Sequence, residues 1–344
     1  MSLEPGPSTL TSTVTHGGVP MRSTALALAL FVAGPASAGD FALLDPTGIT
    51  GAPDHFAAAG VAAPSAAADS TTGELLVAYE TALGAPDAIC PTGIYAVGIA
   101  STLDGESWSH TESPVLGPSG AFPCGVRAPA ITVSNGGQVN VFGEIAAAAA
   151  DCDGGCPADL GIVEVELEGL TPMAAPRIVV DAGGSPTVIR LGDTEEMIFT
   201  LDGDLYGASR RVGGAWSVDA SPSLHAGVSD WNNEGLSSPS LSCEDGGDYA
   251  WELHYTGIGY DDRGYTWAWG SGVSDSGDFW FIDPSGPYLQ RRSGDAPDLS
   301  VVRTTDGGRV VFVELPSRGG PVIAIASDTP TWRPSRIQSL HCEP

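Results

Sequence analysis

The sequence predicts an all-β protein, folded as a five-bladed β-propeller of four-stranded antiparallel blades. Three observations lead to this prediction. Glycine and proline are frequent, with 46 and 27 residues, and long helical periodicities are hard to find. A unit of four parts recurs five times along the chain. Each copy of that unit is followed by a second hairpin, so that each copy supplies four strands.

The recurring unit begins with a proline after small residues and continues as an apolar strand. A Gly or Asp turn follows, and a second apolar strand then ends in an acidic or aromatic residue. The first copy runs from Val61 through Thr72-Gly73 to Glu80. The five prolines are Pro64, Pro129, Pro186, Pro239 and Pro297. Their spacing of roughly 50 to 65 residues is typical of propeller blades with loops of variable length.

The second hairpin is clearest between Ile94 and Leu116, where an apolar strand turns at Asp104-Gly105 and Trp108 follows. The equivalent turns are Glu168-Gly169, Gly213-Gly214, Asp275–Gly277 and Asp328-Thr329. A ring of such sheets protects the strand edges that a lone sheet would expose. The predicted blades lie near residues 61–116, 127–175, 184–220, 237–289 and 295–336. A β-sandwich or two unrelated domains is the alternative. Closing the ring requires an N-terminal strand, for which we select Phe41–Leu44.

The N-terminal region has the form of a secretory signal. Met21-Arg22 gives a positive start, Ala25–Val32 an apolar core and Ala36–Ala38 a small-residue cleavage site. A buried helix is the alternative. No cysteine follows the cleavage site to carry a lipid, and no later apolar run is long enough to span a bilayer. We therefore expect a secreted or periplasmic protein. The predicted segments are a disordered leader or misassigned start at 1–20, a signal peptide at 21–38 and one propeller domain at 39–344.

The charge of the chain restricts its partners. It carries 42 Asp and Glu residues against 14 basic residues, all of which are Arg. Nucleic acid and anionic membranes are excluded as partners, because binding to phosphate requires clustered cations. A glycan or another neutral or cationic ligand fits this balance, and we expect the protein to be a monomer.

All six cysteines follow the predicted signal peptide: Cys90, Cys124, Cys152, Cys156, Cys243 and Cys342. An even number in an exported chain favours disulfides over metal ligation, and no His stands at ligand spacing near Cys152 and Cys156 for a zinc site there. Cys152 and Cys156 could close a small loop. Cys90 and Cys124 fall in loops on the same face, and a bridge between them would stiffen its rim. That pairing is a guess within the fifteen connectivities that six cysteines allow.

Three stretches, beginning at Tyr95, Gly184 and Ser237, resemble the five-bladed propellers of the arabinanase/β-xylosidase and invertase/levansucrase glycosidases. The turns at Asp104-Gly105 and Asp275–Gly277 also resemble degenerate sialidase Asp-boxes, which are structural turns. The resemblance covers nearly all of residues 39–344. It implies a glycosyl hydrolase-like fold, while activity depends on particular side chains.

The carboxylates that this resemblance implies are missing. Glycosidases need two carboxylates around the scissile bond. In the arabinanase-like group, a base Asp precedes the first repeated proline, another Asp follows the second, and an acid Glu stands two residues before the third. The positions that correspond here hold Ala63, Ala130 and Gly184. In any register, the residues before the five prolines are Ala63, Ala128, Ser185, Ser238 and Ala296. Asp298, directly after Pro297, alone occupies an equivalent functional position.

A different set of acidic residues ends the second strand of four of the five units. If the first strand of each blade begins at the ligand face, the second strand returns to that face. The residues that end it are Glu80, Glu144, Asp202, Tyr255 and Glu314. Such a ring could hold Ca²⁺ or supply an acid/base pair. The alternative is that these acids are solvated or paired with Arg, as expected in an acidic chain.

Loops on the predicted ligand face add further candidates. Trp231, Asn232 and Glu234 combine an aromatic platform with polar groups, which suits stacking on sugar rings. The alternative is an ordinary loop with a packing Trp. Tyr260 lies in the next loop and could serve the same face.

Three functions remain open. The first is a non-catalytic carbohydrate-binding or surface-recognition module that uses Tyr255, Trp231, Asn232, Asp298 and Tyr260. The second is a glycoside hydrolase with a relocated carboxylate pair from Glu80, Glu144, Asp202, Glu234 and Glu314. The third is a structural or interaction propeller without a small ligand. The missing base places the hydrolase below the binding module.

Overall fold

The computed structural model describes residues 42–51, 55–151, 160–227, 230–243, 250–261, 264–283, 286–287, 289–291, 298–317, 320–328, 332–337 and 341–342. They belong to one compact unit, Gly34–Pro344. The predicted leader and signal peptide lie outside the described residues, as do Cys152 and Cys156.

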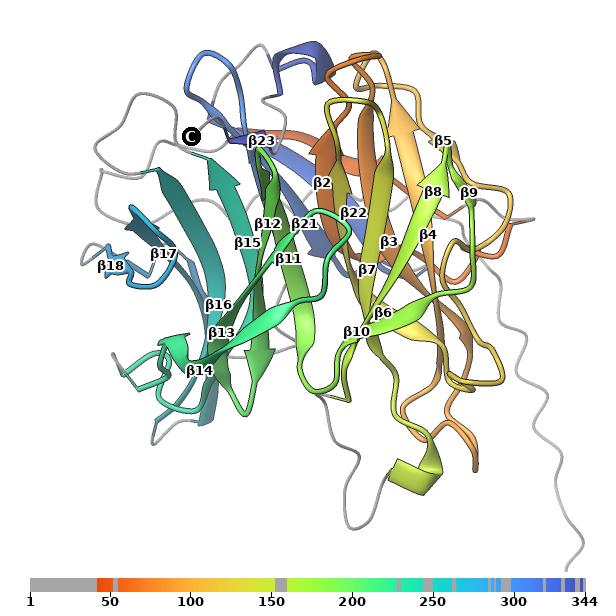
Figure 1. Ribbon diagram of the computed structural model, residues 1–344, viewed down its shortest axis with the longest axis horizontal. Coiled ribbons are helices and arrows are strands. Elements are labelled where there is room, and N and C mark those ends of the chain that lie inside the picture. Colours follow the sequence, from red (N-terminus) through yellow and green to blue (C-terminus); the bar gives the residue numbers. More distant parts are fainter. Residues whose placement is uncertain are drawn as a thin grey trace, which may run out of the picture. The chain divides into compact units, whose positions relative to one another are not determined.

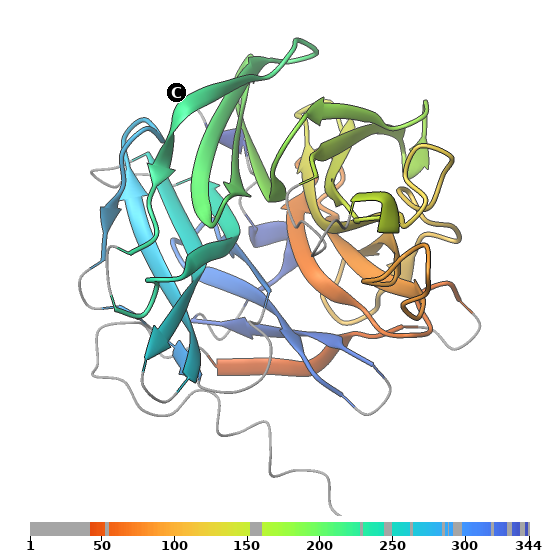
Figure 2. The same ribbon diagram turned by 90° about the horizontal axis from the view of Figure 1, so that it is seen from below.

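Five antiparallel sheets are arranged around a common axis, as the sequence predicts (Figure 2). Blade 1 contains β2 (Ala62–Ala68), β3 (Leu75–Gly84), β4 (Ile94–Thr102) and β5 (Ser109–His110). Blade 2 contains β6 (Val126–Val133), β7 (Val139–Ile145), β8 (Ile162–Glu168) and β10 (Arg177–Val180), with β9 (Thr171–Pro172) also on β8. Blade 3 contains β11 (Gly184–Leu191), β12 (Thr194–Leu201), β13 (Asp204–Arg211) and β14 (Ser217–Leu224).

Blade 4 contains β15 (Gly235–Cys243), β16 (Trp251–Asp261), β17 (Gly264–Ser274) and β18 (Phe281–Ile282), with β19 (Leu289–Arg291) also on β17. Blade 5 contains β20 (Leu299–Arg303), β21 (Arg309–Leu315) and β22 (Val322–Ser327), and its fourth strand is β1 (Ala42–Ile49). Within the described residues, helical structure is limited to the short 3-10 turns η2 (Ala149–Asp151) and η3 (Pro334–Arg336). None of the described helical segments is long and apolar enough to cross a membrane.

The expectation that an N-terminal strand closes the ring is confirmed. β1 pairs antiparallel with β22, so the last blade combines strands from both ends of the domain (Figures 1 and 2). Ile49 is fully buried against Ile323 and Ile325 of blade 5. In the described residues, the outer edge of β22 is paired with β1, and Thr329 of the predicted Asp328-Thr329 turn lies outside them.

The hydrophobic core lies between neighbouring blades. One apolar cluster joins blades 1 and 2 through residues such as Ile99 and Ile131, and another joins blades 3 and 4 through Leu205 and Leu253. Inner strands face a blade on either side, so β20 is buried along its whole length. This packing explains why side chains on both faces of β20 and β6 are mostly apolar and buried.

The two faces of the ring differ. We call the face at which the innermost strands begin the mouth face, and the other the turn face. The Asp104-Gly105 turn lies on the turn face, since it follows β4, which runs away from the mouth. On the same turn face, Ile337 bridges Thr304 of blade 5, and β23 (His341–Cys342) pairs in parallel with the end of β11. The C-terminal segment thus passes from blade 5 to blade 3 at the turn-face ends of the inner strands.

Candidate functional site

The mouth of the central channel is built from one repeated backbone feature. Ala63, Ala128, Ser185 and Ser238, each directly before a repeated proline, have φ between 44° and 47°. This left-handed conformation is costly for residues other than glycine. The strand register shifts at each of these steps, as in a β-bulge. Four blades therefore turn their inner strands toward the axis in the same way.

These turns surround a small cavity of about 30 Å³. Its walls are the four pre-proline residues with their prolines, closed by Asp298 and Leu299 of blade 5. Ligand pockets for small molecules typically span about 300–1,000 Å³. The cavity therefore admits a single small chemical group and not a whole sugar ring.

Three of the predicted carboxylates cap these turns. Glu80 of blade 1 accepts a hydrogen bond from the backbone N–H of Ala128 in blade 2, at 2.9 Å. Glu144 of blade 2 accepts one from Ser185 in blade 3, at 3.1 Å. Glu314 of blade 5 accepts one from Ala63 in blade 1, at 3.2 Å. At each of these positions the bulge leaves a backbone N–H without a partner in its own sheet. The carboxylate of the preceding blade accepts a hydrogen bond from this N–H and so links the two blades.

Acidic side chains outnumber basic ones among the described residues at the mouth, and two of the carboxyl groups have raised pKa values. Arg127 donates from Nε and Nη2 to Glu144, and this ion pair is largely buried. Burial raises the pKa of Glu80 to about 7, and the neighbouring Asp298 and Glu144 add to this rise against the hydrogen bond from Ala128. Burial also raises the pKa of Asp298, although the Ser238 hydroxyl, which donates to Oδ1, opposes this. Perturbed carboxylates of this kind often mark functional sites, but structural networks produce them too.

The other two members of the predicted ring are Asp202 and Tyr255. Asp202 lies in the exposed turn after β12, with φ of 53°. Tyr255 is fully buried, with its ring stacked 5.8 Å from that of Trp231. Tyr255 is therefore part of the core rather than a ligand-binding surface, because Trp231 stacks on its ring.

Trp231 and Asn232 also act in packing. The Trp231 ring lies across β16 and β17, where glycines make room for it: a Cβ at Gly257 or Gly270 would come within 2.3 or 2.4 Å of the ring. Asn232 is 1% exposed. The predicted aromatic platform in this loop is thus mostly occupied by the protein's own strands, while Glu234 is exposed.

Tyr260 is exposed, and its partner is Tyr265, at the other end of the loop that the sequence analysis selected. The rings of Tyr260 and Tyr265 meet edge to face with centroids 5.0 Å apart at the tip of the β16–β17 hairpin. They are 52% and 58% exposed. Asn233 fixes this tip by accepting from the Tyr260 N–H at 2.8 Å and donating to its carbonyl at 3.2 Å. In the sequence, the only sign of this pair is that a tyrosine stands on each side of the loop between Tyr260 and Tyr265.

The positions that the glycosidase resemblance selected carry no chemistry. Ala63 lines the cavity, and Ala130 is 1% exposed beneath it. Gly184 is buried and pairs with Thr200. Asp298 is the one charged residue among the described residues that line the cavity.

No group of three or more His, Cys, Asp or Glu side chains with the geometry of a metal site occurs among the described residues. The idea that the carboxylate ring holds Ca²⁺ gains no support from their arrangement. Instead, Arg127 provides positive charge next to Glu144, and backbone amides take up oxygens of Glu80, Glu144 and Glu314. Arg127 is a site residue that sequence reasoning missed, although it stands two residues before Pro129.

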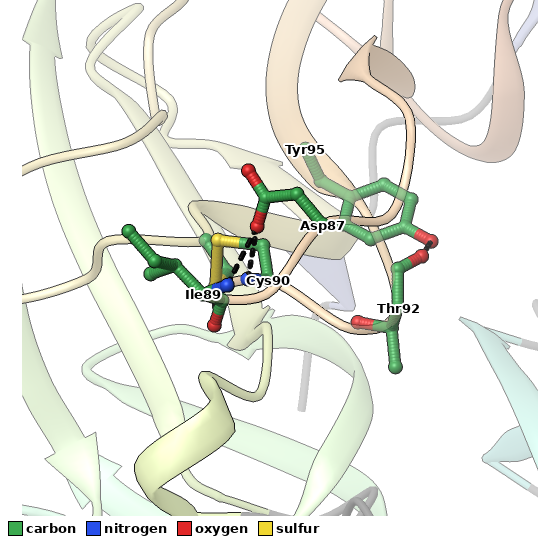
Figure 3. Close-up of a disulfide and its surroundings, with 6 residues drawn as sticks. Asp87, Ile89, Cys90, Thr92 and Tyr95 are labelled. Atoms are coloured by element: carbon green, nitrogen blue, oxygen red, sulfur yellow. Dashed lines mark hydrogen bonds between the residues drawn. A yellow bond between two sulfur atoms is a disulfide. The ribbon is translucent and has the colours of Figure 1, made fainter.

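A disulfide stiffens the mouth face, as the sequence reasoning suggested. Cys90 and Cys124 are bonded, with their Cα atoms 5.3 Å apart (Figure 3). Asp87 accepts hydrogen bonds from the backbone N–H of Ile89 and Cys90, at 2.8 and 2.6 Å, and these lower its pKa. Cys243 is also disulfide-bonded.

Together, these features define a five-bladed β-propeller whose mouth carboxylates hold the blades together. No sequence family and no curated protein matches the chain. Solved structures do match its fold. A glycosyl hydrolase from Bacteroides ovatus aligns with a TM-score of 0.63 and 11% identity, over 92% of this chain and 99% of its own.

Two further solved structures are similar. One comes from work on GH130 mannoside phosphorylases and hydrolases that target β-1,2 mannosidic linkages in Candida mannan. Its TM-score is 0.62 and its identity 12%, over 92% of this chain and 99% of its own. The other, a GH62 hydrolase in complex with xylotriose, has a TM-score of 0.55 and 10% identity, over 82% of this chain and 95% of its own. The fold is therefore that of glycoside hydrolase and phosphorylase propellers.

Proposed function

We propose that the protein is an exported, non-catalytic carbohydrate-recognition propeller. The observation that carries this proposal is the use of the mouth carboxylates. Glu80, Glu144 and Glu314 each accept a backbone N–H of the next blade, and Glu144 is also paired with Arg127. A general acid or base must instead reach a proton on the substrate. Export rests on the segment at residues 21–38, and N-terminal sequencing of protein recovered outside the cell tests it.

The surface that would contact a sugar is the Tyr260–Tyr265 pair. Thr256 pairs with Ser237, next to the cavity, and β16 continues five residues further to Asp261. At about 3.3 Å per residue, the hairpin tip stands about 16 Å beyond the level of the cavity. Exposed tyrosine rings offer an apolar face to a sugar ring and a hydroxyl to its oxygens. A glycan can thus lie against this hairpin without entering the cavity.

The similar solved structures suggest the probes. The GH62 structure contains xylotriose, and the GH130 work concerns β-1,2 mannosidic linkages. We would titrate the protein with xylotriose and with β-1,2-mannobiose by isothermal calorimetry. Binding of at least one is expected, and the double variant Tyr260→Ala/Tyr265→Ala should weaken it at least tenfold.

The chain offers a matched control. Phe279 and Phe281 also form an exposed edge-to-face pair, with centroids 5.4 Å apart, next to the turn that follows β17 on the turn face. The variant Phe279→Ala/Phe281→Ala should bind as the parent does. Equal loss in both double variants, or binding that is unchanged without the tyrosines, would reject this surface.

A second candidate function is hydrolysis by Glu80 and Asp298. The observation that favours it is that burial raises the pKa of both carboxyl groups and that Asp298 raises that of Glu80. The test is release of mannose from β-1,2-mannobiose and of xylose from xylotriose. We expect no turnover. Turnover that is abolished by Asp298→Asn would replace the non-catalytic proposal.

A further inference from the structure

The connection from β1 to β2 completes the ring, because it leads from blade 5 into blade 1. We call its residues 55–61 the closing segment. At its end, the N–H of Val61 donates to the carbonyl of Pro321, next to β22, at 2.8 Å. The Thr81 hydroxyl of blade 1 donates to the carbonyl of Gly60 at 2.8 Å. Val61 is fully buried in the apolar cluster that joins blades 1 and 5. The closing segment is therefore part of the contact that closes the ring.

His55 holds the other end of the closing segment, and its hydrogen bonds define its protonation state. Nε2 lies 2.6 Å from the carbonyl oxygen of Thr111, so this nitrogen must carry a hydrogen. Nδ1 accepts a hydrogen bond from the N–H of Ala57 at 3.2 Å. The neutral imidazole thus uses both of its ring nitrogens. A second proton would place a donor on Nδ1, opposite the Ala57 donor, and this hydrogen bond would be lost.

A second histidine lies beside His55, on the outer strand β5 of blade 1. The ring centroids of His55 and His110 are 5.7 Å apart, and His110 Nδ1 lies 3.0 Å from the Tyr79 hydroxyl oxygen. The Phe56 ring stacks on Tyr79 in a space that Gly98 leaves open, since a Cβ there would come within 2.7 Å of one ring and 2.6 Å of the other. Two protonated imidazoles would repel each other in this partly buried place.

The other titratable side chains near this pair do not offset that charge. Burial and the neighbouring His55 lower the pKa of His110, and no carboxylate among the described residues opposes this. Blade 5 meets the closing segment through Gly320 and Pro321, which do not titrate. The remaining titratable side chains on the adjoining parts of blade 1 are Tyr79, which is fully buried, Tyr95, which donates to the Thr92 carbonyl, Glu80, which caps Ala128 of blade 2, and Glu112, which is exposed. The side chains of Asp45 and Asp54 lie outside the described residues.

The packing of the closing segment therefore favours neutral histidines. The pKa of His110 is lower in the folded protein than in the unfolded chain, where it is near 6.5, so the folded state binds its proton less tightly. The stabilisation that neutral His110 supplies is fully present above about pH 6.5 and is lost as the pH falls below that value. Acid thus weakens the contact between the closing segment and blade 1.

We propose that His55 and His110 form an acid-sensitive latch on the closure of the ring. Protonation of the pair removes the hydrogen bond from Ala57, drives the two rings apart and releases the closing segment from blade 1. The end of β1 then loosens, because Ile49 packs in the same apolar cluster as the closing segment. This latch does not depend on the proposed carbohydrate function.

Hydrogen exchange followed by mass spectrometry tests the latch locally. Exchange is measured at pH 7.5 and pH 5.0 and corrected for the intrinsic chemical rate at each pH. Protection of peptides within residues 42–61 should fall by about tenfold or more at pH 5.0, while that of β12 in blade 3 should not change. A local measurement is needed because Glu80, whose pKa is raised, has the opposite effect on global stability. Unchanged protection of residues 42–61, or an equal fall in β12, overturns the proposal.

Variants assign the effect to the two histidines. His55→Gln/His110→Gln removes both titrating groups, while each glutamine can still donate and accept a hydrogen bond, so protection should be equal at the two pH values. If this variant does not fold, His110→Gln alone takes its place and should lessen the fall. The matched control is His225→Gln, because the His225 side chain is 67% exposed in the loop after β14. It should show the full fall. A fall that is as large in the glutamine variants as in the parent, or that disappears in His225→Gln, overturns the latch.

Discussion

Glu80 illustrates how one residue at the mouth serves the fold. Its carboxylate caps Ala128 of the next blade, yet it does so in a buried and negatively charged place, and its pKa rises to about 7. The folded state therefore holds the proton more tightly than the unfolded chain, in which the pKa is near 4.5. The stabilisation that this proton supplies is fully present below about pH 4.5 and is lost as pH rises through about 7.

This linkage predicts how Glu80→Gln behaves. The glutamine keeps a neutral cap at every pH, so it should be more stable than the parent at pH 8, by at most about 3 kcal/mol. The two proteins should differ little at pH 5. Urea unfolding at both pH values measures the difference, with the exposed Glu112→Gln as control. An equal difference at pH 5 and pH 8 would show that Glu80 does not titrate in this range.

At the residue scale, the sequence placed the important side chains without revealing their role. It predicted that Glu80, Glu144 and Glu314 gather at the mouth, because the ends of second strands meet on one face. It did not reveal that the residues before the prolines adopt left-handed conformations whose amides need acceptors. That need arises only when the next blade is in place.

At the scale of the elements, blades 2 and 3 are joined by a buried ion network that no sequence pattern indicated. Arg210 of β13 donates from Nε to Glu195, at 2.6 Å, and from Nη1 to Glu164 of β8, at 2.8 Å. Its guanidinium also stacks 4.5 Å from the Trp216 ring. All three charged side chains are at most 1% exposed.

Removing the cation of this network should be costly. Arg210→Met leaves the buried Glu195 without this guanidinium and Glu164 with only the half-exposed Arg177, whose Nη2 donates to it at 3.0 Å. We expect a loss of about 3–5 kcal/mol in the free energy of unfolding. Arg211→Met, at the adjacent and exposed position, should change it by less than about 0.5 kcal/mol. Denaturant unfolding of the two variants measures both. A loss below about 1 kcal/mol for Arg210→Met would mean that water or rearrangement replaces the guanidinium.

The strand that closes the ring allows a second prediction at this scale. Ile49 of β1 is fully buried in blade 5, while Ile178 on the outer strand β10 is 51% exposed. Ile49→Ala should destabilise the fold by about 2–5 kcal/mol, because it opens a cavity where the two ends of the domain meet. Ile178→Ala should cost far less, as expected for an exposed edge. Similar losses in the two variants would indicate that β1 contributes little to closure.

At the scale of the whole molecule, charge dominates. The chain has a net charge of −28 at pH 7, and self-repulsion of this size opposes the compact state. Salt shortens the screening length from about 30 Å at 0.01 M to about 10 Å at 0.1 M. The melting temperature should therefore rise between 0.01 and 0.3 M NaCl. A temperature that stays constant or falls would show that attractive ion pairs, such as those of Arg210, outweigh the general repulsion.

The sequence by itself determined the architecture. Five prolines at regular spacing, paired Gly and Asp turns and an unpaired N-terminal strand specify a closed ring, because each sheet must bury its faces and protect its edges. The same reasoning anticipated the bridge between Cys90 and Cys124. These features depend on local pattern and on connectivity, both of which can be read along the chain.

Only the tertiary structure decided what the mouth can do. Tyr255 and Trp231 pack on each other, and the Tyr260–Tyr265 pair stands free above them. Asp298 faces a cavity of about 30 Å³, while the other carboxylates hold backbone amides. Whether a side chain serves a ligand or its own fold depends on which neighbouring blade lies against it. For Glu80, Glu144 and Glu314, the amide that decides this is more than forty positions away in the sequence.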